Sequence, residues 1–291
     1  MEHASSDTRF RERLDELDPS HLRPLCKTLF AQLQRAKGLE GFAYLDGHDL
    51  ISIDGTGYFS SQTIHCAQCA EKHHRNGTTT YYHQMLGAVL VHPDCAEVFP
   101  LVPEPILKPD GARKNDWESN AAKRLLTDLR REHPHLKLIV VEDALASNGP
   151  HIRHLQALDL PFILGAKPSD HAFLFDWVAA SAHTAEASFD EEKGFRHRFR
   201  DLNGVPLNHA NFDLEMNFLE YREHAPDGSI THFSWVTDLL VEDSNLMTLM
   251  RGARARWKIE NETFNTLETK AITSSTTSVT ANSISAPCSC T

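Results

Sequence analysis

One apolar segment constrains the fold more than any other part of the sequence: LKLIVVEDA, residues 136–144. It is a continuous apolar run that ends in acidic side chains, whereas a strand with one solvated face would alternate apolar and polar residues. Such a run is typical of a central strand that is buried on both faces of a sheet. It therefore predicts an α/β fold with helices packed against the sheet.

Composition excludes several other classes of protein. The 291 residues are 41% hydrophobic and 24% charged, which argues against global disorder. No apolar run reaches the ~18 residues that a membrane span needs, and the polar N-terminus has no apolar signal region. Six cysteines make no disulfide scaffold, so the expected location is the cytoplasm. The net charge of −11 argues against tight nonspecific binding of DNA.

Changes in pattern divide the chain into five predicted segments. They are a helical N-terminal segment (1–40), the first part of the core (41–175), a β-rich insertion (176–238), a closing strand and helix (239–268), and a tail (269–291). The insertion is predicted from alternating charged and aromatic residues with an Asp-Gly turn at 227–228. The tail is dominated by Ser, Thr, Ala and Cys and carries too little apolar surface to order itself.

Three carboxylates form the candidate active site. Asp54 and Asp143 each end a predicted strand, and Glu260 lies on a helix predicted over 245–267. Either aspartate alone is also typical of a turn or of a helix cap. Glu260 falls on the apolar stripe of its helix, where an unpaired carboxylate is costly and needs a cation. That cation is either a metal or Arg256 one turn earlier, and the second case leaves a purely structural ion pair.

Two aspartates and a glutamate are hard oxygen ligands of the kind that suits Mg²⁺ or Mn²⁺. Two such ions activate a water or a 3′-hydroxyl and stabilise the leaving oxygen of a phosphodiester. The trio therefore predicts a two-metal site for Mg²⁺ or Mn²⁺ at Asp54, Asp143 and Glu260.

Three strings in the sequence carry a family resemblance: IDGTGYFSS, VVEDALASNGPHI and RARWKIENETFNTL. They resemble the catalytic segments of insertion-sequence DDE transposases, in the group with a Tyr–Arg–Glu–Lys signature. The resemblance covers roughly residues 41–267. It implies an RNase H-like mixed sheet flanked by helices, with a β-rich insertion before the last catalytic helix. It also implies that Asp54, Asp143 and Glu260 bind the metal.

The same resemblance makes Arg256 the signature arginine, placed near phosphate or the glutamate, and makes Arg254 a further candidate for DNA contact. Two positions depart from the signature: Ala253 stands where the tyrosine is expected, and Leu267 and Glu268 stand where the lysine is expected. These departures affect the expected contacts to the cut DNA end more than the metal site.

The function implied by the resemblance is metal-dependent cleavage and transfer of DNA strands in transposition. Its partners would be the terminal inverted repeats and target DNA, and its active form a homodimer at the nucleoid, without a membrane. Two alternatives stay open from the residues alone. One is a noncatalytic remnant that retains DNA or zinc binding, and the other is an RNase H-like nuclease.

The tail also predicts a change of reading frame close to codon 268. Back-translation of residues 271–291 permits a shifted peptide, YHLEHNFGHGKQHLSSVLMH, which resembles the segment after the catalytic helix in this family. The expectation is a transposase truncated after that helix, without the usual N-terminal DNA-binding domain. We expect little or no activity from such a chain.

A cysteine–histidine cluster predicts a second metal site. Cys66 and Cys69 form a C-x₂-C pair, followed by His73 and His74, with His83 and Cys95 further on. Such a pair with nearby histidines is typical of a structural Zn²⁺ site, although the sequence leaves the fourth ligand open. The alternative is a pair of reduced thiols beside surface histidines.

Arg196, Arg198 and Arg200 alternate within FRHRFR, so on a strand they project from one face. This pattern predicts a stripe that contacts the DNA backbone. The alternative is a solvated face whose charge is offset by Asp190, Glu191 and Glu192.

Overall fold

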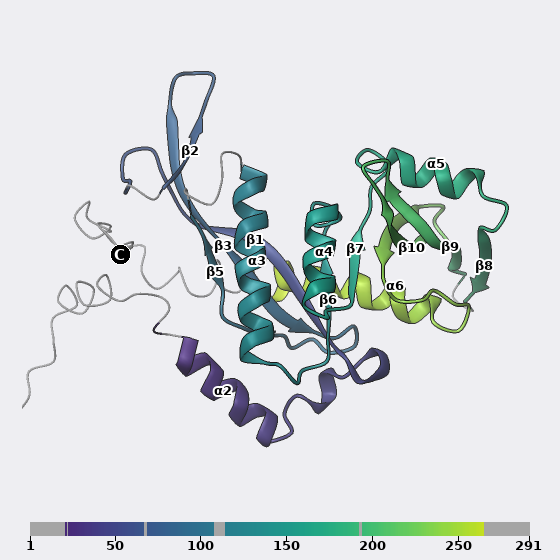
Figure 1. Ribbon diagram of the computed structural model, residues 1–291, viewed down its shortest axis with the longest axis horizontal. Helices are drawn as coiled ribbons and strands as arrows, with labels where there is room; N and C mark the ends of the chain where they lie inside the picture. Colours follow the sequence, from purple (N-terminus) through teal and green to yellow (C-terminus); the bar gives the residue numbers. More distant parts are fainter. Residues whose placement is uncertain (1–20, 22, 67–68, 108–113, 192–193, 265–291) are drawn as a thin grey trace, which may run out of the picture.

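A computed structural model describes residues 21, 23–66, 69–107, 114–191 and 194–264 of the chain. Their strands form one mixed sheet in the order β2-β3-β1-β6-β7-β11-β10-β9-β8, with β4 and β5 paired to β3. The α-helices of these residues, α2 to α6, flank the sheet (Figure 1). The predicted class, a mixed sheet flanked by helices, is confirmed.

Three parallel strands form the centre of the sheet, and a fourth strand runs antiparallel beside them. They are β1 (Asp49–Ser61), β6 (Leu138–Glu142) and β7 (Phe162–Gly165), with β3 (Thr79–Val91) antiparallel to β1. Every residue of β6 is buried, as its continuous apolar sequence predicts. The first strand was expected to end at Asp54-Gly55, but β1 continues to Ser61 because β3 pairs with it beyond that point.

Helices close the two faces of this central sheet. Leu138 and Val140 of β6 pack into one hydrophobic cluster with α3 (Lys114–Glu132) and α4 (Gly149–Ala157). Ile139 and Val141 point the other way and pack with α6 (Leu246–Arg254). This alternation follows from the two-residue period of a strand.

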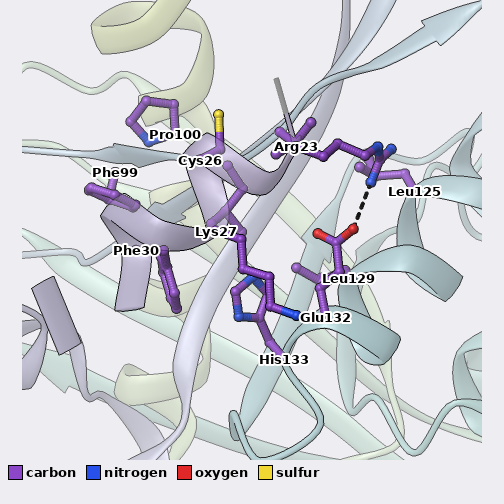
Figure 2. A pocket seen from close by; sticks show the side chains of 12 residues that line it. Arg23, Cys26, Lys27, Phe30, Phe99, Pro100, Leu125, Leu129, Glu132 and His133 are labelled. Carbon is purple, nitrogen blue, oxygen red and sulfur yellow. Dashed lines mark hydrogen bonds and ion pairs between the residues drawn. The ribbon is translucent and has the colours of Figure 1, made fainter. Parts of the chain in front are cut away.

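A short helix, α2 (Arg23–Arg35), packs beside α3 at the edge of the core (Figure 1). Figure 2 shows Phe30 of α2 between Phe99 and His133, with ring centroids 5.6 and 4.5 Å away. Arg23 donates to Glu104 at 2.7 Å and to Glu132 at 3.3 Å. Phe99 belongs to β4 (Phe99–Pro100) and Glu104 to β5 (Glu104–Ile106). The predicted helical N-terminal segment is thus observed over α2, and residues 1–20 and 22 lie outside the described residues.

The β-rich insertion is also observed. It consists of β8 (Ala185–Asp190), β9 (Arg196–Asn208), β10 (Asn211–His224) and β11 (Ile230–Thr237), preceded by α5 (Ala172–Ala180). Asp227 and Gly228 form the predicted turn. Gly228 has a φ of +84°, and the Asp227 carboxylate accepts a hydrogen bond from the Ser229 amide. Because β11 pairs antiparallel with β7, the insertion extends the core sheet and does not form a separate one.

Two expectations for residues 239–268 were wrong. No strand lies between 239 and 245; β11 closes the sheet earlier, by pairing with β7. The helix predicted over 245–267 is α-helical only as far as Arg254 and continues as a 3₁₀ turn (Ala255–Trp257) and a π-helical turn (Ile259–Phe264).

The tail at 269–291, with its predicted change of frame, lies outside the described residues. Among the described helices, none combines the length and apolarity needed to cross a membrane.

Candidate active site and metal-ligating cluster

Asp54 lies on β1 just beyond the point where this strand stops pairing with β6. The parallel ladder ends at Ser52 and Val141, and β1 then continues beside β3 with Asp54 opposite Gly87. Ser52 and Asp54 share one face of the strand because they are two residues apart. The Ser52 hydroxyl donates to the Arg256 carbonyl at 3.0 Å, so this face of β1 meets the segment after α6.

Asp143 directly follows β6 at the same end of the sheet. Its Oδ1 accepts a hydrogen bond from the Leu145 amide at 2.9 Å, which is the turn role that the sequence left open. Asp143 and Asp54 also line one cavity of about 290 Å³, together with Glu142 and His151. The structure therefore brings together two carboxylates that lie far apart in the sequence.

Arg256 connects Asp54 to Glu260. Its Nη1 donates to Asp54 Oδ2 and to Glu260 Oε1, both at 3.0 Å. The guanidinium is largely buried, with its side chain 15% exposed, whereas the Glu260 side chain is 48% exposed. The Arg256–Glu260 ion pair that the sequence offered as a structural alternative is therefore present, and it extends to Asp54.

The predicted position of Glu260 on a buried apolar stripe was wrong. Glu260 is exposed, as is Trp257 three residues earlier, whereas the neighbouring Ile259 is fully buried. The cause is the change of helical geometry after Arg254: a 3₁₀ turn has 3.0 residues per turn against 3.6 in an α-helix, so the faces shift around the axis. Glu260 consequently lies at the rim of the site.

The electrostatics of the site make Asp54 sensitive to pH near neutrality. Burial and a hydrogen bond with Glu260 raise the pKa of Asp54 to about 6, against the lowering effects of the Arg256 guanidinium and the Gly55 amide. Gly55 donates its amide to Asp54 Oδ1 at 2.8 Å. The carboxylate is therefore mostly ionised at pH 7 and mostly neutral at pH 5.

The chemistry of these side chains fits a hard divalent cation. Asp54, Asp143 and Glu260 offer only carboxylate oxygens, which Mg²⁺ and Mn²⁺ prefer. In the described residues, however, their oxygens do not form a group within 4.8 Å of one another. The guanidinium of Arg256 pairs with both Asp54 and Glu260 in this arrangement and balances one of their two negative charges.

A second cavity, of about 370 Å³, lies on the other side of Asp143. Besides Glu142 and Asp143, its lining contains a set of basic and aromatic side chains: Lys167, His232, Phe233, Trp235, Arg254, Arg256 and Trp257. The Arg254 guanidinium lies over the Phe233 ring at 5.2 Å and pairs with Glu223 at 3.5 Å. Arg254, the last residue of α6, and Arg256, two residues beyond it, are predicted DNA contacts and thus border one cavity beside a candidate catalytic carboxylate.

The three arginines of β9 lie farther along the insertion. Arg196 and Arg198 are exposed, and they alternate with buried residues as predicted for one face of a strand. Arg200 Nε pairs with the buried Glu220 at 2.6 Å. On the neighbouring strand, Asp190 and Glu186 stand opposite Arg196 and Arg200. These acidic partners favour the alternative of a charge-balanced surface over a stripe for DNA.

The predicted zinc ligands are only partly brought together. Cys66 and Cys69 have their sulfurs 3.8 Å apart, and His83 Nε2 lies 3.3 Å from each. His73 and His74 do not join them, because their ring nitrogens bond to Thr79 and Thr80 across the β2–β3 hairpin, where β2 is Ala70–His73. Including these two histidines in the ligand set was therefore wrong, and His83 takes their place.

Sequence reasoning missed a buried ion pair in the first cavity. His151 Nε2 lies 2.6 Å from Glu142 Oε2, and both side chains are buried. Burial alone would lower the pKa of His151, but the Glu142 carboxylate and its hydrogen bond outweigh burial and raise it. The available signal was an acidic residue within an otherwise apolar strand, followed by a histidine in the first turn of α4.

Comparison with known proteins gives no family for this chain. No family model matches the sequence, and no curated protein matches it. One solved structure, the NurA nuclease from Sulfolobus solfataricus, has a TM-score of 0.31 at 10% identity, over 77% of this chain and 82% of that chain. A TM-score of this size carries no argument about function, so the resemblance to DDE transposases stays a prediction.

Proposed function

We propose that this chain is the catalytic core of a DDE transposase, which cleaves DNA strands and transfers them with Mg²⁺ or Mn²⁺. The observation that supports the proposal is the shared cavity of Asp54 and Asp143, with Glu260 linked to Asp54 through Arg256. Its substrates would be transposon ends and target DNA, and its active form a homodimer.

Each residue has a chemical role in this proposal. Asp54, Asp143 and Glu260 would hold the divalent ion, which supplies Lewis-acid activation of the attacking oxygen and of the leaving oxygen. Binding at all three carboxylates requires Arg256 to release one of its two partners. A guanidinium so released is suited to a DNA phosphate, because its fork of donors matches two phosphate oxygens.

The test is Mg²⁺-dependent nicking of a plasmid that carries the DNA flanking this gene, by a version of the chain whose reading frame is restored after codon 268. We expect Asp54→Asn and Asp143→Asn each to lower the nicking rate by about 100-fold or more, since each removes a metal ligand. The control is Asp46→Asn, an exposed aspartate with a φ of +51° that asparagine also tolerates. Cleavage that persists in both site variants, or proceeds in EDTA, would refute the proposal.

A noncatalytic role is the second candidate, and the ion pairs of Arg256 specifically favour it. With the guanidinium 3.0 Å from both carboxylates, part of their negative charge is already balanced without a metal. The two candidates differ in Mn²⁺ binding, which electron paramagnetic resonance measures directly. Binding that Asp143→Asn abolishes supports the enzyme, whereas a wild-type chain that binds no Mn²⁺ but still binds DNA supports the noncatalytic role.

A further inference from the structure

Cys66, Cys69 and His83 lie together at the base of a projecting hairpin. The two cysteines follow β1, and His83 comes from β3, opposite Phe59 in the β1–β3 ladder. β2 continues the same sheet, and the paired ends of β2 and β3 extend beyond the helices (Figure 1). Among the described residues, this is the one group of three metal-ligating side chains whose ligand atoms all lie within 4.8 Å of one another.

We propose that these three side chains bind Zn²⁺ through Cys66 Sγ, Cys69 Sγ and His83 Nε2. Tetrahedral Zn²⁺ has Zn–S bonds of about 2.3 Å and Zn–N bonds of about 2.0 Å, which place two sulfurs about 3.8 Å apart and a sulfur and a nitrogen about 3.5 Å apart. The observed separations are 3.8 Å for the sulfurs and 3.3 Å for each sulfur–nitrogen pair. The ligand atoms therefore stand at zinc-binding distances with little adjustment.

The surrounding contacts hold the ligands in this arrangement. The Cys66 amide donates to Cys69 Sγ at 3.2 Å, a bond that stabilises a thiolate, and the Cys69 amide donates back to the Cys66 carbonyl. The Tyr58 ring stacks on His83 with an interplanar angle of 11°, and Phe59 lies on the same ring at 5.7 Å. These aromatic neighbours direct Nε2 toward the two sulfurs.

The bound ion would fasten Cys66 and Cys69 to β3. Cys69 directly precedes β2, so the metal fixes the strand that forms the outer part of the hairpin. In the described residues no fourth cysteine, histidine or carboxylate joins the group. A water molecule is the simplest fourth ligand, which gives three protein ligands and one exchangeable position.

The first test measures metal content of the full chain expressed in zinc-supplemented medium. We expect about one Zn²⁺ per chain in the wild type and about none in Cys66→Ser and His83→Gln, because each loses a ligand. His73→Ala and His74→Ala are the matched controls, since these histidines stand on the same hairpin but bond to threonines. Loss of zinc in either control to the same extent as in His83→Gln would overturn the ligand set.

Because a ligand variant can lose zinc simply by failing to fold, the second test uses the wild-type chain. After removal of zinc, titration with Co²⁺ should produce intense tetrahedral d–d bands and thiolate-to-cobalt charge transfer. A folded wild-type chain that takes up neither Zn²⁺ nor Co²⁺, or in which Cys66 and Cys69 form a disulfide instead, would refute the site. These readouts are independent of DNA cleavage, so the proposed function and the zinc site can fail separately.

Discussion

At the scale of single residues, Asp54, Arg256 and Glu260 form a coupled set of charges. Two carboxylates share one largely buried guanidinium, and the proximity of Glu260 together with burial raises the pKa of Asp54 to about 6. A folded-state pKa above the ordinary value means that the folded protein binds a proton more tightly than the unfolded chain. The stability that the folded protein gains by binding this proton is fully present below about pH 4 and is lost as the pH rises through about 6.

The first prediction rests on this linkage. In EDTA, the difference in unfolding free energy between Asp54→Asn and the wild type should shift by about 2–3 kcal/mol in favour of the variant as the pH rises from 4 to 7.5. The wild type loses stability over this range because Asp54 becomes charged, whereas asparagine has no charge to desolvate. Urea unfolding at both pH values measures the difference. Asp46→Asn, exposed and outside the site, should show no such gain. An equal difference at both pH values would contradict the raised pKa.

A second prediction concerns the shared cation. Arg256→Gln leaves two carboxylates facing each other, so we expect a loss of about 1–3 kcal/mol at pH 7.5. The loss should be smaller at pH 5, where Asp54 is mostly protonated. Urea unfolding provides the measurement, and Arg254→Gln is the comparison, since the Arg254 side chain is 40% exposed and should cost about 0–1 kcal/mol. A larger loss at pH 5 than at pH 7.5 would rule out this charge coupling.

At the same scale, the proposed zinc ligands show which part of a site the sequence could not reveal. The spacing of Cys66 and Cys69 was sufficient to predict a metal site. The third ligand depends on strand register: β3 pairs with β1 so that His83 stands opposite Phe59, while His73 and His74 face threonines. Register is set by pairing between distant segments, and no local pattern distinguishes His83 from its neighbours.

At the scale of elements, the loop between β6 and α4 positions Asp143. Gly165 of β7 lies directly against this loop: a Cβ there would come within 3.0 Å of the Ala144 amide nitrogen and 3.2 Å of the Asp143 carbonyl carbon. Both neighbours are backbone atoms next to a buried strand, so they have little room to move. The close contact between β7 and the loop therefore fixes where Asp143 stands.

The third prediction tests this contact. Gly165→Ala should lower the unfolding free energy by about 1–3 kcal/mol, because the added methyl overpacks the junction. In the chain with the restored reading frame it should also reduce Mg²⁺-dependent nicking, since Asp143 moves with the loop. Gly57→Ala is the control on β1, where the nearest atom to the added Cβ is 3.8 Å away. If Gly165→Ala matched Gly57→Ala in urea midpoint and in nicking, the close packing would have no role in positioning Asp143.

A helix or strand could be predicted from the sequence only where its apolar pattern fits a single kind of secondary structure. Within the run at 136–144, every residue of β6 is buried, so its assignment as a central strand was confirmed. The apolar pattern after Asn245 was interpreted as one long α-helix, but the chain changes to 3₁₀ and π turns after Arg254. All three geometries give recurring apolar positions at similar spacing, and tertiary packing selects between them.

At the scale of the whole molecule, the insertion and the core share one hydrophobic interior. A single cluster contains Leu125 of α3, Val140 of β6, Val178 of α5 and Phe218 of β10. The sheet is also continuous, because Ile163 of β7 pairs with β11. The sequence predicted a β-rich insertion from residue 176, a position that lies within α5, whereas its first strand begins at Ala185. Its union with the core depends on the β7–β11 pairing, which no local motif encodes.

The fourth prediction is that core and insertion unfold together. Phe218 is fully buried, and Phe218→Ala should cost about 3–5 kcal/mol. Amide hydrogen exchange of β6 peptides, at the other end of the shared cluster, should lose the same amount of protection as β10 peptides. Phe212→Ala, at a 56% exposed position on β10, is the control and should leave both unchanged. Loss of protection confined to β8–β11 would show that the insertion unfolds separately.

The pairing of β1 with β6 has a consequence for how fast the molecule assembles. Ser52 stands beside Val141, and Ile163 stands beside Thr237, so the ladders at the centre of the sheet join segments that are remote along the chain. Closing such large loops costs entropy before any contact compensates for it, and proteins dominated by nonlocal contacts fold slowly. Apolar strands such as β6 then stay exposed for longer, which makes folding intermediates the stage at which this chain is most exposed to aggregation and to capture by chaperones.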